Sequence, residues 1–128
     1  MLEGNFFDIQ TFAASQASES EQQVRAVTIL NLQHPVFGGH FPGNPVVPGV
    51  CQVQMVRELV AKALEIPVKL YESDNIKFLS MINPVENPSI EFDIRIRPAD
   101  KNQYVVHALI GSASSVFLKF KGKFQGEE

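Results

Sequence analysis

Cysteine is almost absent from this 128-residue chain, and tryptophan is absent altogether. The single Cys51 excludes an intrachain disulfide framework and a zinc finger, and it is typical of a reducing compartment. Basic residues are also few, because 11 Lys and Arg stand against 14 Asp and Glu, for a formal net charge of −3. A chain with this charge has little means of neutralising a run of phosphates, so nucleic-acid binding is not expected.

The N-terminus has none of the features of a secretory signal. It carries Glu3 and Asp8 and has no lysine or arginine among its first residues. The bulk composition, with 45% hydrophobic and 20% charged residues, is typical of a folded globular chain. We therefore expect a soluble cytoplasmic protein in which residues 1–128 form one domain.

Charge is missing from one long stretch, between Ala26 and Met55. A bilayer is crossed by about 20 apolar residues, so the length alone would allow a membrane span. However, His34 and His40 lie within it, together with prolines at positions 35, 42, 45 and 48, and these exclude one continuous spanning helix. The stretch is better interpreted as a buried loop that enters a core element, and it is the first place to look for chemistry.

The remaining pattern predicts one long helix among several strands. Pro48 and Gly49 open a helix over 48–65, which Pro67 ends. Its apolar face is predicted to contain Val50, Val53, Val56, Val60, Ala63 and Leu64, although Arg57 falls on the same side. Strands are predicted over 24–31, 75–79, 90–97, 104–110 and 116–124. Residues 6–12 suggest a short strand or a docked N-terminal segment, and the polar residues 16–23 a surface loop or turn. This is an α+β layout in which a sheet covers one helix.

Glycine and proline are concentrated in residues 34–50, which implies a tightly specified backbone path just ahead of the helix. His40 lies in this path. The first N–H groups of a helix lack intrahelical partners and could bind the oxygen of a carbonyl group. A histidine beside them could remove a proton α to that carbonyl. From the residues alone, a simple structural turn remains the alternative.

The segment GHFPGNPVVPGV, which begins at Gly39, resembles the signature of the 3-hydroxyacyl-acyl-carrier-protein dehydratases, the FabZ/FabA group. Asn75-Ile76-Lys77-Phe78 and Asn83-Pro84-Val85 extend the resemblance along the chain. The resemblance implies a hot-dog fold, in which an antiparallel sheet of five or six strands wraps around one long central helix. It also implies dimers that pair their sheets edge to edge and enclose an acyl tunnel at the interface.

The same resemblance assigns site residues. His40 corresponds to the catalytic histidine, and Gly49 to the glycine whose N–H holds the thioester carbonyl. The family's catalytic Glu or Asp comes from the helix of the other subunit, and Gln54 occupies that position here. The residues expected to contact the acyl substrate are Phe41, Pro42, Gly43, Pro48, Val50 and Val53.

Gln54 is a departure with chemical consequences. A glutamine amide can hydrogen-bond a hydroxyl group but cannot donate a proton to it near neutral pH. One helical turn later the chain has Glu58, where the dehydratases commonly have glutamine. Glu58 would lie about 6 Å further along the helix on a similar face. It either replaces the missing acid or pairs with Lys62 or Arg57 as an ordinary surface residue.

The predicted function is therefore removal of water from a 3-hydroxyacyl thioester, giving a 2-enoyl thioester, in fatty-acid or polyene-type lipid biosynthesis. The substrate would be carried on the phosphopantetheine of an acyl carrier protein, with no metal or other cofactor. The chain would form a homodimer, or a heterodimer with another dehydratase-like chain. The alternatives are a non-catalytic acyl-binding subunit and a hot-dog thioesterase.

Three weaker signals remain outside this assignment. His34 and His40 have no nearby Cys, Asp or Glu, so a metal site is not expected. Cys51 is interpreted as a small packing residue rather than a nucleophile. The final strand carries a stripe of basic residues that could meet an acidic carrier protein, or could be a solvated strand face that protects a sheet edge. The stripe consists of Lys119, Lys121 and Lys123.

Overall fold

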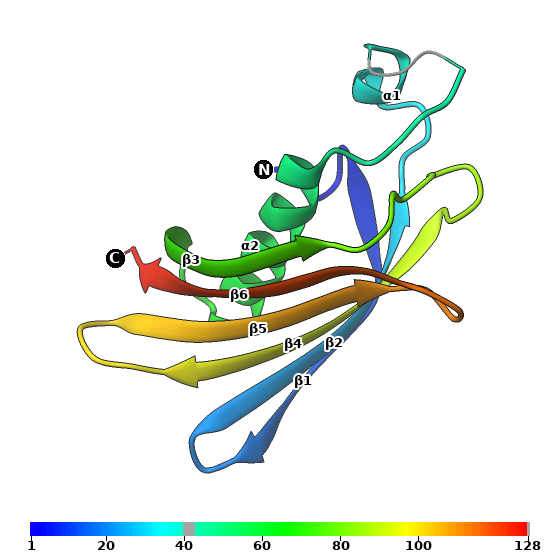
Figure 1. Ribbon diagram of the computed structural model, residues 1–128. Coiled ribbons are helices and arrows are strands. Elements are labelled where there is room, and N and C mark those ends of the chain that lie inside the picture. Colours follow the sequence, from blue (N-terminus) through cyan, green and yellow to red (C-terminus); the bar gives the residue numbers. More distant parts are fainter. Residues whose placement is uncertain (40–42, 128) are drawn as a thin grey trace.

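The computed structural model describes residues 1–39 and 43–127, and its largest feature is a six-stranded sheet (Figure 1). All neighbouring strands run antiparallel, in the order β1-β2-β4-β5-β6-β3. The strands are β1 Phe7–Ser18, β2 Glu21–Leu30, β3 Val68–Phe78, β4 Ser89–Pro98, β5 Gln103–Gly111 and β6 Val116–Gly126. The sheet is open, with β1 at one edge and β3 at the other.

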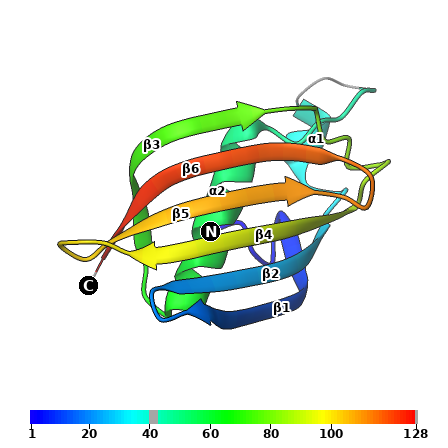
Figure 2. The same ribbon diagram turned by 60° about the horizontal axis from the view of Figure 1, so that its bottom comes forward.

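The helix α2, Gly49–Leu64, lies against one face of this sheet, and the sheet curves around it (Figure 2). Pro48 precedes it with an extended backbone, and Glu65 ends it in the left-handed conformation at φ 59°. Pro67 follows two residues later and lacks the N–H that a continuing helix would need. The predicted central helix and the hot-dog arrangement are confirmed. A five-residue helix, α1 Pro35–Gly39, was not predicted.

Alternating side chains place the core between α2 and the sheet. In β4, Ile90, Phe92, Ile94 and Ile96 are buried, while Glu91, Arg95 and Arg97 are exposed on the opposite face. The helix contributes four side chains with essentially no exposed surface, Met55, Val56, Leu59 and Val60. Each buried aliphatic side chain of this size contributes roughly 1.5–3 kcal/mol of transfer free energy.

The structure corrects the predicted strand bounds at both sheet edges. β1 and β2 continue through most of the polar segment 16–23, and only residues 19–20 form the turn. β3 begins at Val68, seven residues before the predicted start, and it ends at Phe78. Edge strands have one unpaired side and mostly exposed side chains, so the hydrophobic alternation that marks a strand is weak in them.

The buried face of α2 is also displaced from the prediction. Val50, placed on the apolar face by periodicity, is 78% exposed, whereas Gln52 is 3% exposed. In the first turn of α2, Val50 is thus on the uncovered side of the helix, while Gln52 takes a buried position. Within the described residues, no helix is long and apolar enough to cross a membrane.

Candidate functional site

Three of the predicted site residues, His40, Phe41 and Pro42, lie outside the described residues. The chain is described again from Gly43, which has a positive φ of 83° and is exposed. A side chain would be strained in this conformation, which explains the glycine at this point of the motif. The segment after it leads directly into α2.

Hydrogen bonds on both sides of Val47 fix the entry into α2. The Val47 N–H donates to the carbonyl oxygen of Ile82 at 2.9 Å, and the Val47 carbonyl oxygen accepts from Gln52 Nε2 at 3.2 Å. Pro48 then holds an extended conformation, with φ −60° and ψ 144°. The position of the first helical N–H groups is therefore set by Val47 and Pro48 of the motif together with Ile82 and Gln52 outside it.

Gly49 is the first residue of α2, and the ring of Phe78 lies over it. A Cβ atom added to Gly49 would lie 2.8 Å from Cζ of Phe78, closer than real Cβ contacts. The absence of a side chain thus lets the end of β3 approach the helix. The N–H groups of Cys51 and Gln52 donate to the Pro48 carbonyl oxygen at 3.0 and 3.2 Å. The N–H groups before them, at Gly49 and Val50, stand at the positive end of the helix dipole, where they can bind a carbonyl oxygen or an oxyanion.

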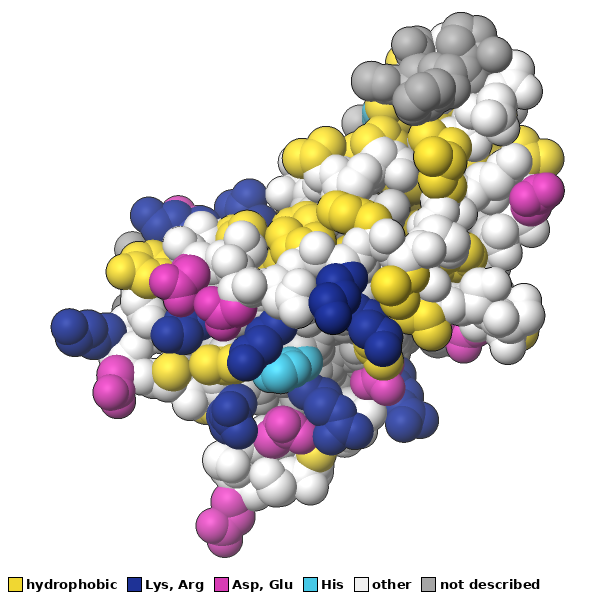
Figure 3. All heavy atoms as spheres, in the orientation of Figure 1, with side chains coloured by type: hydrophobic (Ala, Val, Ile, Leu, Met, Phe, Trp, Pro, Cys, Tyr) yellow, Lys and Arg dark blue, Asp and Glu magenta, His cyan; other side chains and the backbone are white. Residues whose placement is uncertain are grey.

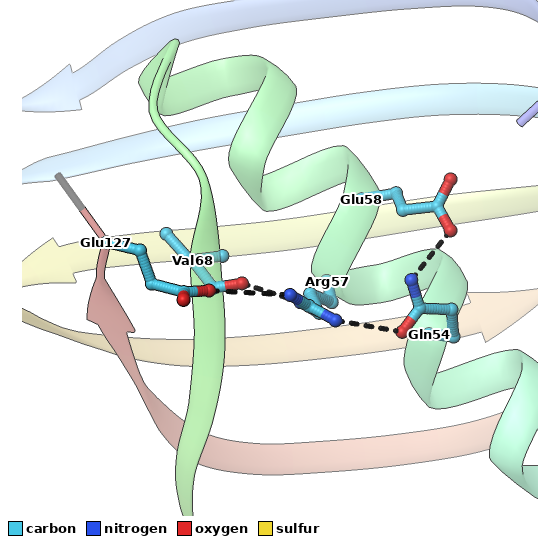
Figure 4. A network of polar contacts seen from close by, with 5 residues as sticks. All are labelled: Gln54, Arg57, Glu58, Val68 and Glu127. Atoms are coloured by element: carbon cyan, nitrogen blue, oxygen red, sulfur yellow. Dashed lines mark hydrogen bonds and ion pairs between the residues drawn. The ribbon is translucent and has the colours of Figure 1, made fainter. Parts of the chain in front are cut away.

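The next predicted site residue, Gln54, belongs to a polar network with Arg57 and Glu58 (Figure 4). Gln54 Nε2 donates to Glu58 Oε2 at 2.8 Å, and Arg57 Nη1 donates to Gln54 Oε1 at 3.4 Å. Arg57 Nε also donates to the carbonyl oxygen of Val68 at 2.6 Å. Two different neighbours thus fix the orientation of the Gln54 amide. The bond to Val68 explains why an arginine lies on this side of the helix.

Glu58 is only 9% exposed, and it binds backbone rather than a cation. The N–H of Leu2 donates to Oε2 at 2.7 Å, and the N–H of Glu3 donates to Oε1 at 2.8 Å. The predicted pairing with Lys62 or Arg57 is not found, since Arg57 forms its ion pair with Glu127 at 3.5 Å. Glu58 therefore ties the N-terminal segment to α2 and holds Gln54 at the same time.

These residues line a groove between α2, the N-terminal segment and the start of β3, with a volume of about 490 Å³. Gln54 follows Gly49 by five residues, which places it about 7.5 Å further along the helix and about 140° around it. The two residues therefore face different sides of α2. One chain does not bring Gly49 and Gln54 to the same substrate atom.

The remaining predicted contact residues form no single cluster. Pro48 and Val53 are partly buried, whereas Val50 projects from the first turn into solvent. Burial raises the pKa of the half-buried Cys51 thiol, so this side chain is not a thiolate at neutral pH. His34 Nδ1 accepts the N–H of Val36 at 3.1 Å and has a local structural role. Among the described residues, no group of His, Cys, Asp and Glu could hold a metal ion.

Sequence reasoning missed Gln52. Its amide supports the helix entry, and its Oε1 atom is buried without a hydrogen-bond partner in the described part of the chain. A glutamine in the first turn of a helix is ordinarily exposed, so the sequence carried no signal for this role. The backbone amides of Leu2 and Glu3 were likewise missed, because no side-chain pattern marks them.

The chain was compared with known families and proteins. Residues 16–121 match the ApeI-like family, described as ApeI dehydratase. The 3-hydroxyacyl-[acyl-carrier-protein] dehydratase FabZ of Caulobacter vibrioides is 35% identical over 106 residues, which cover 79% of this chain and 59% of that protein. The FabZ of Nitratiruptor is 34% identical over 111 residues, which cover 84% of this chain and 72% of that protein. The chain thus spans about three-fifths of the length of the Caulobacter relative.

Solved structures agree in fold. The dehydratase heterocomplex ApeI:P from Xenorhabdus doucetiae aligns with a TM-score of 0.58 at 19% identity, over 88% of this chain and 94% of that one. The putative thioesterase YhdA from Lactococcus lactis aligns with a TM-score of 0.69 at 9% identity, over 94% of both chains. At these identities the likeness concerns the fold alone. The same fold accompanies dehydratase and thioesterase descriptions, so function must be argued from the site.

Proposed function

Because this chain belongs to the ApeI-like dehydratase family, we propose that it removes water from a 3-hydroxyacyl thioester carried by an acyl carrier protein. The product is a 2-enoyl thioester for fatty-acid or polyene-type lipid synthesis. The observation that carries the proposal is the motif from His40 to Gly49, which ends at the first turn of α2. The dehydratase names of the FabZ relatives support the reaction type.

In this proposal the thioester carbonyl oxygen binds the N–H groups of the first turn of α2, at Gly49. Negative charge develops on that oxygen when a proton leaves the α carbon, and fixed N–H dipoles at a helix N-terminus stabilise such charge. His40 is the base that takes the proton. The phosphopantetheine arm comes with the substrate, because it belongs to the carrier protein. The groups that this chain itself supplies to the reaction are the side chains of His40 and Gln54 and the N–H of Gly49.

Gln54 binds the departing hydroxyl group. Glu58 accepts one of its two amide N–H groups, which leaves the other free to donate to the hydroxyl oxygen. An amide has no proton to give, so the proton that His40 takes from the α carbon is returned to the hydroxyl group as it leaves as water. The step is balanced, because one C–H bond and one C–O bond break and one water is released.

Glu58 acts here as a positioning residue rather than as a replacement acid. Both of its oxygens already accept N–H donors from Leu2, Glu3 and Gln54. Through these hydrogen bonds the Glu58 carboxylate holds the Gln54 amide and the N-terminal segment in place. Its contact with the substrate is therefore indirect.

Replacing Gln54 by alanine should lower kcat/KM for dehydration about tenfold, the value of one hydrogen bond of about 1.4 kcal/mol. Gln54→Glu should keep turnover, since a carboxyl group at this place can also bind the hydroxyl. The initial rate of 2-enoyl thioester formation measures both effects. Wild-type rates in Gln54→Ala would show that residue 54 does not contact the hydroxyl group.

We further propose that the site is completed across a dimer, in which Gln54 of one chain faces His40 and Gly49 of the other. Gly49 and Gln54 face different sides of α2, which supports this. So does the unpaired edge strand β3, where Tyr71 is 59% exposed. The solved ApeI:P structure is described as a heterocomplex. The second chain is either another copy or a different dehydratase-like chain.

Multi-angle light scattering of the purified chain at micromolar concentration should give the mass of two copies. A dimer that encloses a substrate tunnel must bury well over about 1,000 Å² in total, which is enough for a stable complex. A monomer that gains mass and activity only when a second dehydratase-like chain is added would identify the heterodimer. A monomer that is fully active alone would refute the shared site.

The reaction itself is tested by product analysis. The purified protein is incubated with a 3-hydroxyacyl carrier protein, and the carrier is analysed by intact mass while free thiol is measured. The proposal predicts loss of one water with the thioester intact. Release of the carrier thiol would instead show a thioesterase, and an unchanged carrier that stays bound would show a non-catalytic acyl-binding subunit.

A further inference from the structure

Basic side chains gather on the outer face of the sheet, which is turned away from α2 and from Gly49. The basic patch consists of Lys77 on β3, Lys119 and Lys121 on β6, and Arg95 on β4, arranged around His107 on β5. Figure 3 shows lysine and arginine side chains surrounding a histidine on this side of the molecule. The patch is hollowed, with a volume of about 370 Å³, which is within the range of small-molecule sites. It is separate from the proposed dehydration site.

The strand register arranges the basic patch in two neighbouring rows across the sheet. In the first row, Lys121 lies opposite Asn75 of β3 on one side and opposite His107 on the other. Arg95 continues this row as the partner of His107. The first row therefore offers two cations and the amide N–H groups of an exposed asparagine.

The second row begins two residues further along each strand. Lys77 lies opposite Lys119, and Lys119 lies opposite Leu109 of β5, which is 41% exposed. Two residues along a strand correspond to roughly 7 Å. The patch thus presents two centres of positive charge about that distance apart, with an apolar side chain beside the second.

Folding alone gives no reason for this arrangement. Directly opposed like charges, such as those of Lys77 and Lys119, destabilise a sheet. Protection of a sheet edge, which the sequence allowed as a role for the basic stripe, does not apply to Lys119 and Lys121. Their strand β6 is paired on both sides, with β5 and with β3.

Few of these cations are neutralised within the chain. Arg95 pairs with Glu21 at 3.0 Å. For the part of the chain that the structure describes, no carboxylate lies within 4.0 Å of the Lys77, Lys119 or Lys121 ammonium group. The chain as a whole has a net charge of −3, so the positive field is local to this patch.

We propose that the basic patch is a binding site for a small molecule that carries two phosphate groups, one held by each row. A phosphate monoester has a charge of about −1.5 to −2 and three acceptor oxygens, which suits several lysines and an arginine. The spacer between the two phosphates would contact Leu109. The acidic remainder of the chain disfavours a long polyanion such as nucleic acid.

Isothermal titration calorimetry at about 0.1 M salt tests the proposal, with fructose 1,6-bisphosphate and inorganic phosphate as probes. The bisphosphate should bind at least tenfold more tightly, because its second phosphate binds intramolecularly once the first is held. Lys77→Gln/Lys121→Gln removes one exposed cation from each row and should raise Kd for the bisphosphate at least tenfold. Lys69→Gln/Lys101→Gln removes the same charge from exposed positions outside the patch, and this matched control should change Kd less than twofold.

Three results would overturn the site. Equal losses of affinity in the two double variants would show attraction by net charge alone, and equal weak binding of both probes would show an adventitious ion only. Binding of phosphatidylglycerol vesicles or duplex DNA that is lost in Lys77→Gln/Lys121→Gln, without bisphosphate binding, would show a surface for a macromolecule instead.

Circular dichroism checks the fold of each variant. If the double variant in the patch is unfolded, Lys77→Gln and Lys121→Gln are measured singly, and each should raise Kd for the bisphosphate at least threefold. None of these measurements requires turnover, so the anion site stands or falls independently of the proposed dehydration.

Discussion

Dehydration by the His40→Ala variant should be slower than by the wild type by a factor of roughly 10²–10⁴, the usual contribution of a positioned acid–base group. In the proposed reaction His40 both takes the α proton and returns it to the hydroxyl group, so both halves of the step lose their proton carrier. The measurement is kcat for a saturating carrier-free thioester, which removes any effect on carrier docking.

His107→Ala is the matched control, because this exposed histidine lies on the opposite face of the sheet from α2. It should retain the wild-type rate with the same carrier-free substrate. Loss of activity in His107→Ala, with activity retained in His40→Ala, would show that His40 is not the base and that the proposal names the wrong histidine.

The second large effect concerns stability. Glu58→Leu should lower the free energy of unfolding by about 2–4 kcal/mol, because two partly buried backbone N–H groups and the Gln54 amide lose their acceptor. For a domain of this size the melting temperature should fall by roughly 10 °C. Chemical denaturation followed by circular dichroism gives the free energy directly.

Gln54→Ala is the control for Glu58→Leu, since it removes one of the three donors and leaves both backbone bonds in place. It should cost about 1 kcal/mol or less. Equal stability losses in the two variants would mean that the bonds to Leu2 and Glu3 contribute nothing. The N-terminal segment would then not be fixed by Glu58 in solution.

The fold was predictable where side-chain periodicity is strong. The alternation of residues 90–97 gave β4 almost to the residue, and Pro48 and Pro67 bracketed α2 correctly. The first half of β3 was not predictable, because an edge strand with exposed side chains on both faces has no hydrophobic period to detect. The exposure of Val50 was missed because periodicity groups apolar residues on one face of a helix but does not show which side of that face the sheet covers.

The site was predictable only in part, and for a similar reason. The glycine at position 49 and its place at the start of α2 follow from the motif. The contacts of Glu58 with Leu2 and Glu3 join residues 56 and 55 positions apart and use backbone amides, which leave no trace in a single sequence. The roles of Arg57 and Gln52 likewise depend on tertiary neighbours, the Val68 and Val47 carbonyl oxygens.

The central claim is that His40 transfers a proton at the α carbon of a thioester held at the first turn of α2. It is tested most directly by hydration of a 2-enoyl thioester in deuterated water, with mass spectrometry locating the deuterium. The wild type should give a 3-hydroxyacyl thioester with one deuterium on the α carbon, and His40→Ala should give almost none. Deuterium incorporation at the wild-type rate by His40→Ala would contradict the account.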